Sequence, residues 1–132
     1  MKKWNWFWSS NLLNLEEQLR IPSLFRPILR CTKLFDSRLD KLDAKRFHKL
    51  CDKYPETVII IKSRNYISGG YFDRTWFGKK LYKSSEKSFL FNLNRMKKYH
   101  IKKNQYAGFC DRESFPCFGS YFTSLFLNLM VF

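Results

Sequence analysis

The sequence predicts an α+β domain that is mainly β, with short helices in its N-terminal half and strands after residue 57. Four consecutive β-branched residues, 58–61, give a clear strand signal. The capping and helical-spacing signals lie before that run. The chain has 132 residues, of which 45% are hydrophobic and 19% aromatic, enough for one domain with its own core.

The central element that we expect is a β-hairpin over residues 57–71. The run 58–61 is too short for a helix and suits a strand buried on both faces. Residues 63–65 have turn chemistry, and residues 66–72 predict a returning strand. Within that strand, Gly69 and Gly70 indicate either a bulge or a close approach of another part of the backbone.

Two short helices are predicted before the hairpin. Asn14 and Glu17 have the spacing of a capping box, so a helix begins there and ends near Pro22. Residues 23–30 predict a turn and then a helix or a strand. A second helix opens at Asp43 and stops at Pro55. Its apolar face consists of Ala44, Phe47, Leu50 and Cys51.

The remaining segments are extended or irregular in our interpretation. Residues 33–35 form a short extended piece, and residues 73–85 form a polar connection that carries Trp76. Strands follow at 88–93, at 97–102 as an amphipathic edge strand, and at 105–110. At the N-terminus, Trp4, Trp6 and Trp8 alternate, as in a strand or arm packed on the domain, an interfacial anchor or a poorly ordered terminus.

The net charge of +14 suggests an anionic partner, although the abundance of Lys, Asn, Phe, Ile and Tyr also fits A/T-rich codons. Residues 79–103 hold nine Lys or Arg and one acid, Glu86, a balance of 9 − 1 = +8. A solvated sheet edge explains such lysines. The alternative is a nucleic-acid-binding module, which the interleaved aromatic residues allow, although no named nucleic-acid motif is present. These aromatic residues are Tyr82, Phe89, Phe91, Tyr99 and Tyr106.

The four cysteines match no disulfide framework and indicate a reducing compartment. A zinc site of His48, Cys51, Cys110 and Cys117 can be drawn, but it lacks the close cysteine pairs of structural zinc sites. A thiol nucleophile would need Cys110 or Cys117 beside a histidine. Buried, inert cysteines are the simpler interpretation. Neither the phosphate-binding glycine motifs nor the hydrolase motifs occur, and no stretch reaches the roughly 20 apolar residues that span a bilayer.

Several short blocks, in order and at suitable spacing, resemble the TLDc domain family. They begin with Ser-Arg-Leu-Asp at 37–40 and continue through Phe-His-x-x-Cys-Asp at 47–52 and Thr-Val-Ile-Ile-Ile-Lys at 57–62. Further blocks lie at 69–71, 82–84, 88–93, 104–111 and 116–119. The motif residues, which we take as structural, are Asp40, Phe47, His48, Cys51, Asp52, Thr57, Lys62, Gly69, Gly70, Tyr71, Trp76, Phe89, Phe91, Cys110 and Gly119.

The resemblance implies a partial antiparallel two-sheet sandwich flanked by short helices. It also implies a cytoplasmic, non-enzymatic module linked to resistance to oxidative stress and to binding of the vacuolar proton-pumping ATPase. The family brings no agreed catalytic residues, cofactor or metal. The alternatives from the residues themselves remain a basic nucleic-acid-binding module and a thiol-dependent redox enzyme.

The resemblance divides the chain into an aromatic segment with a short helix at 1–33, a partial TLDc-like domain at 34–119 and a divergent apolar tail at 120–132. Where the family continues with glycines, this chain has Ser120-Tyr121-Phe122 after Gly119. A sandwich that ended there would have unpaired strand edges unless a partner or the apolar tail filled the gap.

Overall fold

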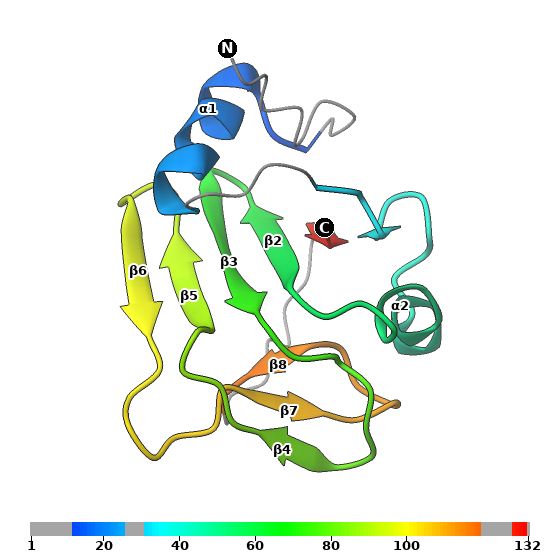
Figure 1. Ribbon diagram of the computed structural model, residues 1–132. Helices are drawn as coiled ribbons and strands as arrows, with labels where there is room; N and C mark the ends of the chain where they lie inside the picture. The colour runs from blue at the N-terminus through cyan, green and yellow to red at the C-terminus, as the bar shows by residue number, and fades with distance from the viewer. Residues whose placement is uncertain (1–11, 26–30, 120–127, 132) are drawn as a thin grey trace.

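The computed structural model describes residues 12–25, 31–119 and 128–131, and its strands form two antiparallel sheets (Figure 1). Sheet A has six strands in the order β1-β9-β2-β3-β5-β6, and sheet B has three in the order β4-β7-β8. This confirms the predicted α+β, mainly β class. The elements are α1 (Leu15–Leu24), β1 (Phe35–Asp36), α2 (Ala44–Cys51), β2 (Thr57–Ser63), β3 (Tyr66–Phe72), β4 (Leu81–Lys83), β5 (Phe89–Asn92), β6 (Lys97–His100), β7 (Gly108–Cys110), β8 (Cys117–Phe118) and β9 (Asn128–Val131).

The predicted hairpin is the middle of sheet A. Strands β2 and β3 pair without interruption from Thr57 opposite Phe72 to Ser63 opposite Tyr66. Because the register is unbroken, the two glycines of β3 do not form a bulge. Val58 and Ile60 face one core while Ile59 faces the other, as expected for a strand buried on both faces.

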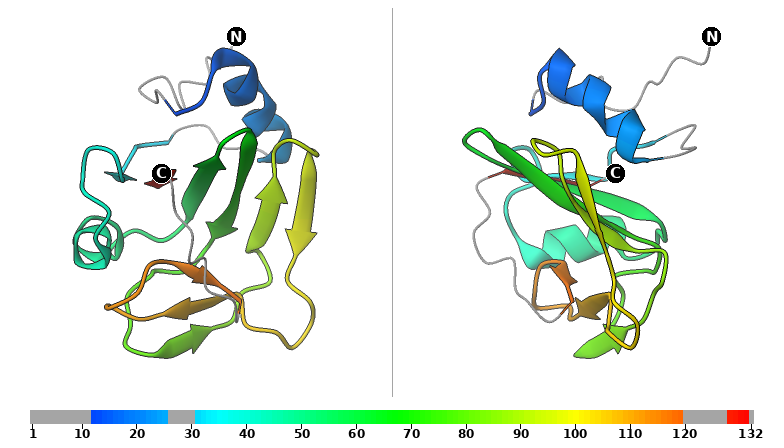
Figure 2. Two further views of the ribbon diagram at one scale, coloured as in Figure 1. Left: turned by 180° about the vertical axis from the view of Figure 1, so that it is seen from behind. Right: turned by 90° about the vertical axis from the view of Figure 1, so that its left-hand side faces the viewer.

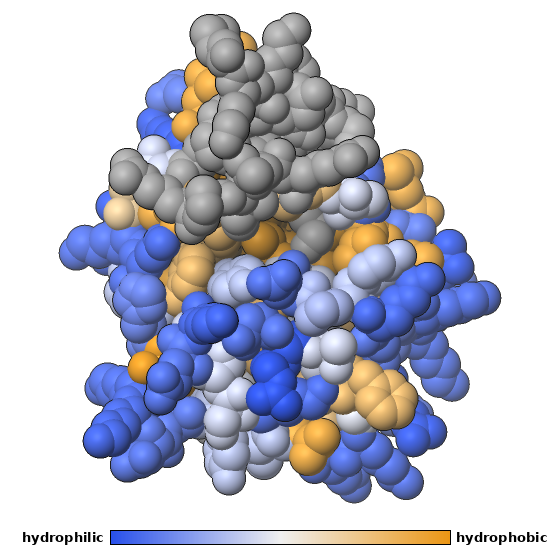
Figure 3. Space-filling view, viewed as in Figure 1, coloured by the Kyte–Doolittle hydropathy of each residue, from blue (hydrophilic) through white to orange (hydrophobic). Residues whose placement is uncertain are grey.

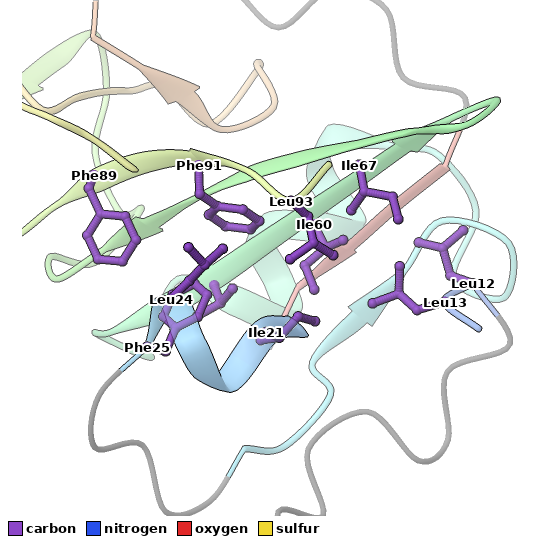
Figure 4. Close-up of a cluster of buried hydrophobic side chains, with 11 residues drawn as sticks. Leu12, Leu13, Ile21, Leu24, Phe25, Ile60, Ile67, Phe89, Phe91 and Leu93 are labelled. Carbon is purple, nitrogen blue, oxygen red and sulfur yellow. The ribbon is translucent and has the colours of Figure 1, made fainter. Parts of the chain in front are cut away.

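Each face of sheet A carries its own hydrophobic core. Figure 2 shows α1 on one side of this sheet and α2 with sheet B on the other. The first core lies under α1, where Ile21, Leu24 and Phe25 meet Phe89 and Phe91 (Figure 4). The second core lies between sheet A, sheet B and α2. Its buried members are Phe35, Phe47, Cys51, Ile59, Phe72, Trp76, Ala107, Cys110, Phe118 and Val131.

Helix α1 begins at the predicted capping box. The Asn14 side chain accepts from the Glu17 amide at 2.9 Å, and the Glu17 carboxylate accepts from the Asn14 amide at 2.8 Å. The helix continues to Leu24, two residues beyond Pro22. Helix α2 has the predicted N-cap, Asp43, and ends at Cys51, before Pro55. Among the described residues, no helix is long and apolar enough to cross a membrane.

Three strands lie where sequence reasoning placed none. β4 lies inside the segment predicted as a polar connection, and β8 and β9 follow the last predicted strand. β9 is inserted between β1 and β2, with Val131 opposite both Phe35 and Ile59. The apolar tail therefore supplies a strand that covers the edge of β2. The predictions for residues 1–10 and 26–30 lie outside the described residues.

Candidate functional site

His48 fastens α2 to the loop that joins β7 and β8. Its Nδ1 lies 2.6 Å from Asp52 Oδ1, and its Nε2 lies 2.8 Å from the main-chain oxygen of Ser114. Asp52 follows His48 by four residues, so both side chains lie on the same side of the helix end. The ring is 8% exposed and meets Phe47 edge-on. Because both ring nitrogens are engaged, His48 is arranged as a structural link rather than a general base.

Trp76 fills the second core beside this link. Its indole N–H donates to Thr57 Oγ1 at 2.9 Å, and both side chains are fully buried. The Phe72 and Phe118 rings lie 4.1 and 5.3 Å from the Trp76 ring, centroid to centroid. Eight of the motif residues thus lie in or around this core, namely Phe47, His48, Cys51, Asp52, Thr57, Gly70, Trp76 and Cys110.

Gly69 and Gly70 lie where sheet A has no room for a side chain. A Cβ at Gly69 would overlap the main-chain oxygen of Ile59 and lie 2.7 Å from the Phe91 ring. A Cβ at Gly70 would lie 2.6 Å from Cε1 of Phe118, on the opposite core. The predicted close approach of backbone is therefore confirmed at Gly69, whereas at Gly70 the neighbour is the Phe118 side chain, and both glycines allow close packing.

The other motif residues of β2, β3 and β5 face α1. Phe89 and Phe91 are buried in the first core, where Tyr71 packs against Phe89 at 5.5 Å between ring centroids. Burial, together with the Glu56 carboxylate to which the Tyr71 hydroxyl donates, raises the pKa of Tyr71 to about 12. Lys62 Nζ lies 3.1 Å from Glu17 Oε2. These contacts fix α1 on sheet A.

A second polar cluster holds the turn between β1 and α2. Asp40 accepts from the Asp36 amide at 2.9 Å, and Asp36, which is 1% exposed, pairs with Arg38 at 2.7 Å. Burial would raise the pKa of Asp36, but the hydrogen bonds and charge of Arg38, with the charge of Lys33, lower it overall. Gly119, at φ +68°, donates to the Ala107 main-chain oxygen at 2.8 Å and ends β8.

A TLDc domain family model matches residues 7–130 of this chain. The match covers nearly the whole sequence, and it includes both helices, the first eight strands and all of β9 except Val131. The chain belongs to the TLDc domain family. A comparison with curated proteins found no match. The TLDc match extends past both ends of the 34–119 segment that the motif blocks outline, and the three-part division of the chain stays a prediction.

The cysteines of this TLDc domain are poor candidates for thiol chemistry. Cys51, Cys110 and Cys117 are buried and Cys31 is half-buried, and none of the four forms a disulfide within the described residues. Burial raises the pKa of Cys51 to about 12 and those of Cys31 and Cys110 to about 11. A reactive cysteine needs a lowered pKa, so the environment keeps these thiols protonated near neutral pH.

Cys110 and Cys117 lie on opposite faces of sheet B in this TLDc fold. Cys117 pairs with Phe109 across β7 and β8, so these two share one face of sheet B and Cys110 occupies the other. His48 is engaged elsewhere, so the four possible zinc ligands do not meet. Among the described residues, no cluster of three or more His, Cys, Asp or Glu could hold a metal ion.

Sequence reasoning missed the contacts that join distant segments. Glu17 was identified as a capping residue and Lys62 as a motif residue, but nothing local indicates that they form an ion pair 45 positions apart. Asp36 was likewise not singled out, although it is a buried acid. The acid-base spacing of Asp36, Arg38 and Asp40 is the signal that could have identified that cluster.

Proposed function

We propose that this TLDc domain is a non-enzymatic interaction module that binds the vacuolar proton-pumping ATPase and contributes to resistance to oxidative stress. The observation that carries the proposal is the family match over residues 7–130. In the same proposal the protein works in the cytoplasm, at the surface of acidic organelles. The motif residues keep a structural function, in which they build the two cores and hold the helices on the sheets.

The polar groups of the core support a binding function over a catalytic one. The His48 ring is used between Asp52 and Ser114, and the Trp76 indole is used by Thr57. A general base or an activated nucleophile needs a free lone pair directed at a cleft. The groups described here are instead used in internal hydrogen bonds, so their arrangement favours a scaffold.

The first test is recovery of the assembled proton pump on immobilised protein. We expect pump subunits to be enriched over an unrelated basic domain of equal net charge, because non-specific attraction would affect both equally. Equal recovery by the two domains would refute pump binding.

The second test separates the module from a thiol-dependent enzyme. A variant with all four cysteines replaced by alanine or serine, checked for folding by circular dichroism, should protect cells from peroxide as well as the unmodified chain does. Loss of protection by the folded variant would instead favour the redox enzyme.

A further inference from the structure

The outer face of sheet B carries a cluster of aromatic rings open to solvent. Tyr82 on β4 lies opposite Phe109 on β7, with 4.7 Å between ring centroids, and its ring lies 5.0 Å from that of Tyr106. Tyr82 and Tyr106 remain 47% and 52% exposed. Neither tyrosine hydroxyl has a hydrogen-bond partner among the described residues. Rigid, half-exposed tyrosines of this kind are enriched in protein interfaces.

A hollow of about 400 Å³ adjoins this aromatic cluster. Residues 84–86 form one wall and residues 101–106 the other, so Tyr106 belongs to both the cluster and the hollow. The wall at 101–106 turns sharply, with Gln105 bonded back to Lys102 and Asn104 at φ +64°. A backbone turn therefore shapes this wall of the hollow.

The charge around the hollow is positive and not neutralised. Lys102 and Lys103 line it, both are exposed, and neither pairs with a carboxylate within the described ranges. The other seven Lys and Arg of residues 79–103 also form no ion pair with a carboxylate within the described ranges. Figure 3 shows hydrophilic residues over most of this face of the molecule, including the side where β6 runs into the loop. An anionic partner would find cations there that form no ion pair with the described acids, and Glu86 is the one acid that lines the hollow.

We propose that the hollow and the adjoining aromatic cluster bind an acidic, extended segment of a protein partner. Carboxylates of that segment meet Lys102 and Lys103, and an apolar side chain next to them packs on Tyr82, Tyr106 and Phe109. The inference deepens the proposed function, on which it rests, by naming the docking surface and the chemistry of the partner.

Two observations favour a peptide over a nucleic acid. Tyr82 contacts both Tyr106 and Phe109 in tilted ring pairs, so part of its ring surface is used within the cluster and less is left for a base to stack on. Glu86 lines the hollow opposite the lysines. A peptide can place a neutral residue beside Glu86, whereas a nucleic acid carries a charge on every nucleotide.

The test uses the full chain and two labelled probes of equal charge. One is a twelve-residue peptide with six glutamates and one leucine, and the other is a single-stranded oligonucleotide with six phosphates. The variant K102E/K103E reverses two charges at the hollow. Its matched control, K45E/K49E, makes the same charge change at two exposed positions of α2 that do not line the hollow. Helix α2 packs on the face of sheet A opposite to α1.

We expect the wild-type chain to bind the peptide more tightly than the oligonucleotide. K102E/K103E should weaken peptide binding about tenfold at low salt, and the control should change it less than about twofold. Tyr106→Ser, which leaves the charge unchanged, should also weaken binding. The proposal is overturned if both double variants weaken binding equally, if the oligonucleotide binds more tightly, or if the peptide does not bind.

The pump pull-down with the same variants separates this inference from the proposed function. If K102E/K103E recovers the pump as well as wild type does, pump binding stands and this surface is refuted as its docking site. If wild type binds the peptide at the hollow but recovers no pump, the surface stands and the proposed pump function fails.

Discussion

At the scale of single residues, the hydrogen bond from Trp76 to Thr57 joins two segments through a wholly buried polar contact. Thr57 begins β2, and Trp76 lies in the connection after β3. A buried indole N–H without an acceptor loses its solvation with no compensation. The position of the segment that follows β3 therefore depends on the hydroxyl group of Thr57.

Removal of the Thr57 hydroxyl should destabilise the fold only while the Trp76 indole is present. We expect Thr57→Val to lower the free energy of unfolding by about 1–3 kcal/mol, because it leaves the Trp76 N–H unpaired. In a Trp76→Phe background the same substitution should cost less, with a coupling of about 1 kcal/mol in a double-mutant cycle. Urea unfolding of the four proteins measures both values. Additive effects would show that the hydrogen bond contributes nothing.

The buried thiols predict how stability depends on alkaline pH. The folded chain raises the pKa of Cys51 to about 12 and that of Cys110 to about 11, from 9.0. Above pH 9 the unfolded chain therefore loses thiol protons that the folded chain keeps, so stability is complete below pH 9 and falls as the pH rises toward 11. The slope is at most about 1.4 kcal/mol per pH unit for each thiol.

Urea unfolding at pH 8, 9 and 10 tests this prediction. In Cys51→Ala and in Cys110→Ala, the free energy of unfolding should fall less steeply with pH than in the unmodified chain. The smaller side chain also lowers the free energy of unfolding by an amount that does not depend on pH. The same protonation should make Cys110 react slowly with iodoacetamide at pH 8 until the chain unfolds. Rapid alkylation of the folded chain would contradict it.

Residue types alone predicted some of these packing features but not others. Two adjacent glycines inside a strand indicated a close approach of backbone, and Gly69 shows one. The burial of His48 was not foreseen, because a histidine between a buried phenylalanine and a lysine looks like a surface residue on a short helix. Its partner Ser114 lies 66 positions away, and local sequence carries no information about that contact.

At the scale of elements, local signals located the structures that form locally. The β2–β3 hairpin and the starts of α1 and α2 follow from β-branched runs and capping residues within a few positions. β4, β8 and β9 were missed because they have three, two and four residues, and each is a strand only through its partners. For β9 those partners are β1 and β2, far earlier in the chain.

The attachment of α1 to sheet A depends on Lys62 as well as on apolar packing. Its Nζ donates to the Leu12 main-chain oxygen at 3.0 Å and to both carboxylate oxygens of Glu17. The two side chains are 23% and 18% exposed, so solvent screens this pair less than a surface pair.

Lys62→Met should loosen α1 while retaining the apolar stem of the side chain. We expect amide exchange in α1 to speed up about tenfold, which corresponds to about 1.4 kcal/mol, while exchange in β3 and β5 stays unchanged. Arg20→Met is the control, because it removes the exposed pair with Glu16 and should cost less than about 0.5 kcal/mol. Equal exchange in the two variants would show that apolar packing alone holds the helix.

At the scale of the whole molecule, β9 makes the C-terminal end of the described chain and the strands β1 and β2 interdependent. β1 pairs only with β9 among the described strands, and β9 separates it from β2. Val131 is fully buried in the second core, opposite Ile59. Without β9, β1 would lose its partner and β2 would present an open apolar edge, which is a site for aggregation.

Removal of residues 128–132 should therefore abolish cooperative folding rather than trim a tail. The lost ladder and core contacts amount to several kcal/mol, against a typical net stability of about 5–15 kcal/mol. Calorimetry should show a broad transition without a distinct heat-absorption peak, and size-exclusion chromatography should show aggregates. Removal of residues 1–5, which precede the TLDc match, is the control and should leave a single sharp transition. If the chain without residues 128–132 also melted in one sharp transition as a monomer, sheet A would not need β9, and the second core would have to be closed by other contacts.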